Sequence, residues 1–419
     1  MKSLLRATWF AGMLGAVAAD AASPPATRLA DLIAEALHRH PKVQLALQRY
    51  QSARQRMAQE GALPDPVLSV GYASVGRPYP LAGLGAQPMA NAGLMFMQEF
   101  PAPGKRRLRA ALAYQEAEAL YQQYQAVRLQ LVARLKQAYY RLAYAHAAAG
   151  VLERYRKLLE EMLESSEARY RAGLAPQADV FKLQTEMTLL EARLARLEQE
   201  RAIQEAEIQQ ILARPAGAGI GAPEPLPPPV ELPPLASLLE AAARNSPVLV
   251  QREKSIAGAE LALNLAHRQF SPDWGLSAGY FSMGRMGSMY MFRAEFTLPF
   301  LNGHRWRAAV AENLERVSAE RRSHEAEALS LRLRIQQEYL AAGTAARLAR
   351  LFRENVIPLA NLTLQASLAS YQTGASDLLT VLSNFQGLLE HELSYYAELA
   401  GYHSAVSRLE ELTGGVLPQ

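Results

Sequence analysis

The chain of 419 residues contains no cysteine. Without thiols it cannot form disulfides or thiolate metal sites, and a cysteine nucleophile is excluded. Acylation of an N-terminal cysteine, the usual anchor of lipoproteins, is excluded as well. We therefore expect a protein that is not lipidated.

Long uncharged apolar runs are also missing. Beyond the first 22 residues, no window of about 18 residues is apolar and free of charge, so we expect no transmembrane helix. Residues 1–22 begin with Lys2 and Arg6, continue with a short apolar run and end in small residues around Ala19 and Ala21. This order is typical of a signal peptide and predicts export. A membrane-anchor helix is the alternative, but the apolar run is short for a span.

Motifs for catalysis are missing too. Gly104-Lys105 lacks the glycine spacing and the serine or threonine of a phosphate-binding loop, and there is no nucleophile elbow. His38 and His40 lie two residues apart, so they point to different faces of a helix. Basic and acidic residues are interleaved and the net charge is only +4, which indicates solvated helix faces rather than a nucleic-acid surface. We predict that the chain is not an enzyme, needs no cofactor, has no metal site of its own and binds no nucleic acid.

A repeated turn dominates what the sequence does contain. Residues 170–173 read Tyr-Arg-Ala-Gly and residues 371–374 read Tyr-Gln-Thr-Gly, about half the chain apart. Each copy follows a long segment rich in alanine, leucine and charge. A glycine after a long helix is typical of a left-handed C-cap, and Pro176 fits the first turn of a following helix. Each copy therefore predicts a tight turn between two long antiparallel helices.

The two halves of the chain match outside the turns as well. Residues 29–43 align with residues 235–249 at nearly the same offset, which indicates a long internal repeat. A segment rich in proline and glycine lies between the halves and predicts an extended linker. The predicted units are a signal peptide, a first repeat, the linker, a second repeat and a C-terminal tail, at residues 1–22, 23–213, 214–234, 235–413 and 414–419.

Each half follows one order of elements: a helix, two strands, a long helix, the turn and a return helix. Period-2 alternation with aromatic and β-branched residues predicts the strands. The first helices are expected at residues 43–61 and 248–270, and the strands at residues 67–76, 92–100, 274–284 and 288–298. The strands are about 9–11 residues long, enough for a tilted strand to cross a bilayer. Four strands cannot close a barrel, so they are either pooled across subunits or form a soluble sheet.

The helices after the strands are unusually long. The first runs without a helix breaker over residues 105–172, roughly 100 Å at 1.5 Å per residue. Its counterpart in the second half is expected to be interrupted at residues 343–344 and at Pro358. The return helices carry apolar residues in steps of four and three, typical of a coiled-coil seam. These residues are Leu183, Met187, Leu190, Leu194 and Leu197, and then Leu378, Leu382, Phe385, Leu389, Leu393, Tyr396 and Leu399.

Methionine is concentrated in the strand regions, which hold seven of the twelve. Along the predicted strands, Met95 and Met97 share one face, whereas Leu94 and Phe96 share the other. If the aromatic face meets lipid, some methionines point into a lumen. Thioether sulfur suits soft cations such as Cu(I), which makes Met95, Met97, Met289 and Met291 candidate contacts for soft metals; apolar filling of the wall is the simpler interpretation.

The duplicated order of elements resembles the TolC-type outer membrane factor family over essentially the whole mature chain. The segments GALPDP at residues 61–66 and PGKRR at residues 103–107, with the YxxG turns, are most similar to its heavy-metal-efflux branch. The resemblance implies a fold that is mainly α with a membrane β-barrel portion. Three chains pool four strands each into one 12-stranded outer membrane barrel, which a helical barrel of roughly 100 Å continues across the periplasm. The linker then belongs to an equatorial belt.

The resemblance also assigns a site to the turns, which close the periplasmic end in the family. The implied residues of the gate and of the adaptor contact are Tyr170, Gly173, Asp179, Tyr371, Gly374 and Asp377. Asp179 matches an aspartate that locks the closed entrance, and Tyr371 matches the tyrosine that pairs with it. The family's arginine and two ring carboxylates are replaced here, by Ser376, Thr380 and Ser383.

Asp377 is the acidic residue nearest to the missing ring of carboxylates and could replace it by a shift of a turn. Three copies of Asp377 on one axis would repel one another and raise the pKa of each carboxyl. The simpler interpretation of both Asp179 and Asp377 is capping of a helix N-terminus or favourable interaction with its dipole.

The implied function is a passive outer membrane exit channel of a tripartite efflux system for metal cations. The implied partners are two further copies of the chain in a homotrimer, outer membrane lipid, a periplasmic adaptor (membrane fusion protein) and an inner-membrane, proton-driven pump of the RND type. A drug-efflux channel and a type I secretion channel of the same family are alternatives. A periplasmic coiled-coil adaptor would explain the long helices and the signal, but not two pairs of aromatic strands.

Overall fold

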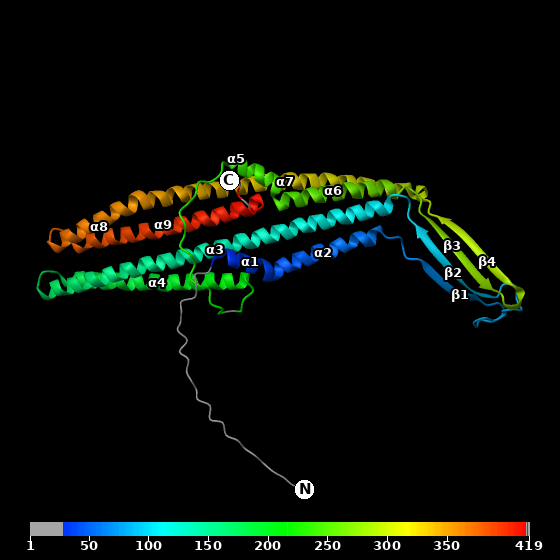
Figure 1. Ribbon diagram of the computed structural model, residues 1–419, viewed down its shortest axis with the longest axis horizontal. Helices are drawn as coiled ribbons and strands as arrows, with labels where there is room; N and C mark the ends of the chain where they lie inside the picture. The colour runs from blue at the N-terminus through cyan, green and yellow to red at the C-terminus, as the bar shows by residue number, and fades with distance from the viewer. Residues whose placement is uncertain (1–27, 216, 416, 418–419) are drawn as a thin grey trace, which may run out of the picture.

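The computed structural model describes residues 28–215, 217–415 and 417, so the predicted signal peptide lies outside the described residues. The chain forms a long layer of helices that a four-stranded sheet continues at one end (Figure 1). No helix among the described residues has both the length and the apolarity that crossing a membrane requires.

The two halves of the chain have the same order of elements, as the sequence predicted. The first half contains α1 (Leu29–Arg39), α2 (Pro41–Gly61), β1 (Val67–Ala73), β2 (Asn91–Phe100), α3 (Lys105–Arg171) and α4 (Gln177–Ile211). The second half contains α5 (Leu235–Asn245), α6 (Pro247–Arg268), β3 (Trp274–Ser282), β4 (Ser288–Phe296), α7 (Gly303–Leu351), α8 (Ile357–Gln372) and α9 (Leu378–Thr413). In both halves a proline opens the second helix, where its missing N–H has no helical partner to lose.

The predicted interruption of the second long helix is wrong in one place and displaced in the other. Helix α7 continues through Gly343, because a single glycine costs only about 1 kcal/mol in a helix that packs along its length. The break comes at Phe352–Val356, one π-helical turn in which the Ile357 N–H reaches the Phe352 carbonyl. Pro358 is the second residue of α8; its ring would clash with the preceding turn of a regular helix, so the wider turn takes up the strain.

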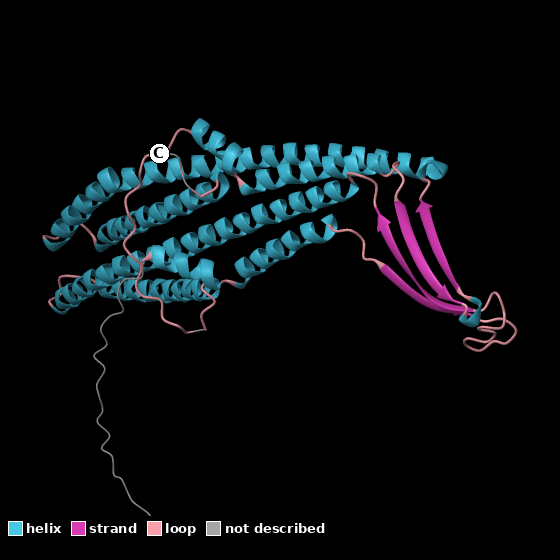
Figure 2. Ribbon diagram, turned by 45° about the vertical axis from the view of Figure 1, so that its right-hand side comes forward, coloured by secondary structure: helices cyan, strands magenta, loops and turns pink. Residues whose placement is uncertain are grey.

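The four strands form one antiparallel sheet in the order β1-β2-β3-β4. Strand β1 is shorter than predicted, since Ser74 and Val75 leave the ladder and bond to Tyr79 and Ala82 in the following loop. Along the rest of the layer the helices lie in the same lateral order as the strands: α2 with α4, then α3, then α6 with α9, and last α7 with α8 (Figures 1 and 2). The layer therefore has two open edges, one at β1 and α2, the other at β4 and α7.

Buried side chains form separate clusters along the helices rather than one globular core. One cluster surrounds Leu135 and Ile208 midway along α3, a second surrounds Leu238 and Ile335 in the other half, and the largest lies at the end opposite the sheet. The helices are therefore packed against one another at several points along a layer that is roughly 100 Å long.

The linker between the halves is extended, as predicted, and side chains of the helical layer hold it. The backbone N–H of Glu224 donates to the Tyr139 hydroxyl at 2.8 Å, and the Tyr402 hydroxyl donates to the Val230 carbonyl at 2.7 Å. Nε2 of His403 lies 2.9 Å from the Pro227 carbonyl oxygen. The linker thus crosses α3 and α9 midway along the layer (Figure 1).

Candidate functional site

The two YxxG turns have nearly identical backbone geometry. Gly173 and Gly374 both adopt the left-handed conformation, with φ of 75° and 77°. The next N–H in each turn, that of Leu174 or Ala375, reaches back five residues to a carbonyl at 2.8 Å. This is the Schellman arrangement, in which a residue with a Cβ would be strained at the glycine position. The prediction of paired glycine-capped turns is confirmed in its geometry.

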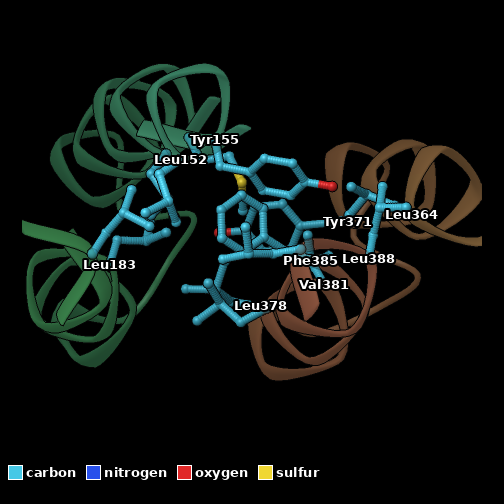
Figure 3. Packing of buried hydrophobic residues seen from close by; sticks show 14 of the residues in the cluster. Leu152, Tyr155, Leu183, Leu364, Tyr371, Leu378, Val381, Phe385 and Leu388 are labelled. Carbon is cyan, nitrogen blue, oxygen red and sulfur yellow. The ribbon is translucent and has the colours of Figure 1, made fainter. Parts of the chain in front are cut away.

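The tyrosines of the two turns differ although their backbones match. Tyr170 is 44% exposed, whereas Tyr371 is 9% exposed and lies inside the helical layer. Tyr371 sits among side chains from α3, α4, α8 and α9, including Leu183, Phe385 and Tyr155 (Figure 3). The ring of Phe385 meets that of Tyr155 edge to face, with the centroids 5.0 Å apart. The asymmetry makes Tyr371 part of the packing between the hairpins, while Tyr170 faces outward.

An arginine links the two turns. Nη1 of Arg169 donates to the Tyr371 carbonyl at 2.7 Å, and its guanidinium carbon lies 4.6 Å from the centre of the Tyr371 ring. A guanidinium over an aromatic face is attracted by the ring quadrupole. The sequence analysis missed Arg169, because its equivalent in the second turn is Ser370 and the repeat gives no signal there.

Several buried hydroxyls near the turns lack partners among the described residues. They are the hydroxyls of Tyr155, Ser166 and Tyr371. Burial raises the pKa of the Tyr155 phenol. An unpaired buried polar group costs about 1–3 kcal/mol, so a rearrangement that brings an acceptor to the Tyr371 hydroxyl would be favoured.

Asp377 caps the N-terminus of α9. Its Oδ1 accepts the Thr380 N–H at 3.0 Å. The side-chain and backbone hydrogen bonds of Thr380 hold the pKa of the Asp377 carboxyl below its usual value, and Lys182 on α4 adds a weaker attraction. In the single chain, therefore, the pKa moves opposite to the rise expected for three copies on one axis.

Asp179 lies half-buried in the first turn of α4, where its charge complements the helix dipole. The structure gives its carboxylate no hydrogen bond among the described residues, and does not join it to Tyr371 within one chain. Ser376 lies in the second turn, and Thr380 and Ser383 are exposed on the first turns of α9.

The sheet has two faces of different chemistry. One face is apolar, and side chains of β1 and β4 are its most exposed members, with Val70 at 79% and Phe292 at 82%. The register places Phe96 and Ala278 between Leu68 and Phe292 in one row across all four strands. The opposite face carries Met95, Met97, Met289 and Met291 together with the charged residues Glu99, Arg293 and Glu295.

The structure does not pair the strand methionines directly. Met95 and Met291 both lie opposite Gly279, so two strand spacings, about 9–10 Å, separate their backbones. The ring of Phe281 lies over Gly279, where a Cβ would come within 2.6 Å of it. Among the described residues, no group of three or more histidine and acidic side chains is arranged to hold a metal ion.

A buried ion pair fixes the junction between sheet and helices. Nζ of Lys105, at the start of α3, lies 2.8 Å from Oδ1 of Asp273, just before β3, and 3.0 Å from the Ser271 carbonyl. The Lys105 side chain is only 2% exposed. The same Asp273 oxygen accepts the Ala102 N–H at 2.6 Å. This contact between the two repeats was also missed from the sequence.

A two-faced sheet with open edges, joined to two repeats of long helical hairpins, defines the fold class of this protein. The sequence matches the model of one family, described as outer membrane efflux protein, over residues 32–214 and 238–415. Because the match covers most of the chain, the protein belongs to the outer membrane efflux protein family. A search of the curated proteins finds no match.

Solved structures share the fold. The outer membrane protein VceC from Vibrio cholerae is 20% identical, with 93% of this chain and 97% of that chain covered and a TM-score of 0.77. The open state of the MtrE outer membrane channel from Neisseria gonorrhoeae is 19% identical, with 93% and 89% covered and a TM-score of 0.77. CusC is 17% identical, with 94% and 93% covered and a TM-score of 0.79.

Proposed function

We propose that the chain is the outer membrane exit channel of a tripartite efflux system. The observation that carries the proposal is the sheet, which is apolar on one face, polar on the other and unpaired at both edges. A strand edge left open in lipid is unstable, whereas edges paired with other copies are not. With four strands per chain, three copies would make a 12-stranded barrel whose apolar face meets lipid and whose methionine-bearing face lines the pore.

The helices support pooling of copies in the same way. The outer edge of α7 and α8 exposes a series of leucines that a single chain leaves uncovered. They include Leu329, Leu333, Leu340, Leu359 and Leu362. The opposite edge, on α2 and α4, exposes Leu45, Phe181 and Leu189. Covering both edges with neighbouring copies turns the layer into a helical barrel that extends from the membrane into the periplasm.

We further propose that the turns form the periplasmic gate and the contact with an adaptor. The Tyr371 hydroxyl is buried without a hydrogen-bond partner among the described residues. The Asp179 carboxylate, half-buried at the start of α4, has no hydrogen bond there either. In a ring of copies, a movement of the hairpins that uncovers the Tyr371 hydroxyl would let each group serve the other across the seam between chains. Asp377, capped onto α9, presents a negative charge near the axis, where it attracts cations. The duct itself is passive, and an inner-membrane pump supplies the energy.

Metal cations are the substrate that we propose. The support is the concentration of methionine on the face that lines the pore, since thioether sulfur favours soft cations. The test is a strain that lacks the gene, challenged with copper, silver, zinc and a panel of drugs. Sensitivity to metals that the wild-type gene reverses supports the proposal. Sensitivity to drugs alone would reassign the chain to drug efflux.

The membrane orientation has its own matched test in two adjacent residues of β4. Arginine in place of Phe292 puts a charge on the lipid face, at a cost of about 2–4 kcal/mol near the midplane. Arginine in place of Met291 puts the same charge on the pore face. We expect F292R to be lost from the outer membrane and M291R to assemble. Equal assembly of the two variants would contradict the orientation.

A further inference from the structure

The junction between Lys105 and Asp273 joins the end of β2 to the start of β3, and so joins the first repeat to the second. Lys105 is buried and Asp273 is partly buried. Asp273 accepts from Lys105 and from the Ala102 N–H, and Lys105 also donates to the Ser271 carbonyl. The repeat means that each of these positions has an equivalent in the other half of the chain.

The equivalents of the two charged residues are exposed. The Gly-x-Arg sequence at the start of the helix aligns Lys105 with His304, with three more residues between Phe296 and Gly303 than between Phe100 and Gly104. The Pro-Asp dipeptide before each first strand aligns Asp273 with Asp65. His304 and Asp65 are both exposed, and neither side chain has a hydrogen-bond partner among the described residues. They lie at opposite edges of the layer, His304 after β4 and Asp65 before β1.

We propose that His304 of one copy donates a hydrogen bond to the Asp65 carboxylate of the next copy. The pair repeats, at the seam between chains, the junction that Lys105 and Asp273 make inside the chain. The inference rests on the proposed function, because only a closed ring of copies brings the two edges together.

The register of the sheet supports a second copy as the occupant of these edges. Repeating the β2–β3 register between β4 and the next β1 sets Phe292 opposite Val70 and Tyr290 opposite Tyr72. Both pairs then fall on the apolar face that the rest of the sheet already has, and Met291 falls on the other face. A slip of one residue would reverse every side chain, so this agreement excludes the registers that are shifted by an odd number of residues.

The charged residues at the two edges also fit a second copy of the chain as the partner. Asp65 is an acidic residue at one edge, whereas the first turn of α7 at the other edge carries His304 and Arg305. The Lys105 side chain at the junction within the chain is 2% exposed, so closure of the ring would bury His304 against Asp65 in the same way. Imidazole N–H is a suitable donor to carboxylate whether or not the ring is charged.

Disulfide cross-linking tests the register, and the absence of native cysteine makes every cross-link an introduced one. Directly opposed strand residues have Cα atoms about 4.5–5.5 Å apart, within disulfide range. We expect V70C/F292C to give covalent dimers and trimers on nonreducing gels. The matched pair V70C/M291C is out of register and should give none, and F96C/A278C should cross-link within one chain only. Ladders from V70C/M291C alone would overturn the register.

A double-mutant cycle tests the pair itself. We expect D65A and H304A each to lower the temperature at which the trimer dissociates in detergent. The dissociation temperature of the double variant should be no lower than that of the less stable single variant. D65N keeps an acceptor oxygen, so it should lower the dissociation temperature less than D65A does. Additive effects, or no effect of either change in a chain that still cross-links through V70C/F292C, would overturn the pair while leaving the channel intact. A monomer in the periplasm would refute the proposed function itself.

Discussion

Replacing Asp273 by alanine leaves the Lys105 ammonium buried with one remaining acceptor, the Ser271 carbonyl. Removing one partner of a buried ion pair costs about 3–5 kcal/mol when the remaining charge stays out of water. Lys105 is 2% exposed, so that penalty applies nearly in full. The reverse change, K105M, leaves Asp273 22% exposed and still bonded to the Ala102 N–H, and should cost only about 1–2 kcal/mol. The free energy of local opening should therefore be about 2 kcal/mol lower in D273A than in K105M.

The double variant D273A/K105M has no orphaned charge, so it should be more stable than D273A alone. The effects of the two single substitutions should therefore fail to add by about 2–3 kcal/mol, which is at the upper end of the interaction energies found for residues in contact. Hydrogen exchange of the amides in the adjoining β2–β3 ladder measures this opening in the intact protein, because the substitutions leave the acceptors of those amides in place. Exposed Arg305, replaced by methionine, is a control for loss of a basic residue at a helix start. If K105M loosens the junction as much as D273A, or if the two changes add, the assignment of Lys105 as the buried and dependent partner is wrong.

The remaining predictions concern the turns and the linker. D377A should weaken the block of single-channel current by multivalent cations, whereas D377N keeps the cap to Thr380 and isolates the charge; unchanged block in both would remove Asp377 from the pore entrance. Y371F should raise the open probability in a bilayer, and Y170F should not, since of these two tyrosines Tyr371 is the one whose hydroxyl is buried without a partner among the described residues. Burial lowers the pKa of His403 below 6.5, so its contribution to stability is present above that pH and is lost as pH falls below it. Limited proteolysis of the linker should therefore accelerate between pH 7.5 and pH 5.5, and less so in H403Q; equal acceleration in both would assign the effect to other groups.

The repeated turns could be predicted from the sequence because their signals are local. Gly173 and Gly374 require a left-handed backbone that few other residues tolerate, and each follows a long helix. The strands were predictable for a similar reason, since alternation over about ten residues is itself the cause of a two-faced strand. Leu183 and Phe385 were correctly placed on buried seams by their spacing.

The contacts that join the repeats could not be found in this way. Arg169 and Tyr371 meet only because α3 and α8 end at the same level, and Lys105 meets Asp273 only because β2 and β3 are paired. Neither fact is encoded within a window of residues. The misplaced break in the second long helix has a different origin: the strength of tertiary packing decided that Gly343 would be tolerated and that Pro358 would be absorbed by a π-turn.

The central claim is that copies of this chain close a pore in the outer membrane. Fractionation of cell envelopes on a density gradient, followed by the mass of the detergent-extracted protein, tests it most directly. The account predicts the chain in the outer membrane fraction as a trimer that survives mild detergent and dissociates on heating. A monomer released with the soluble periplasmic contents would contradict it.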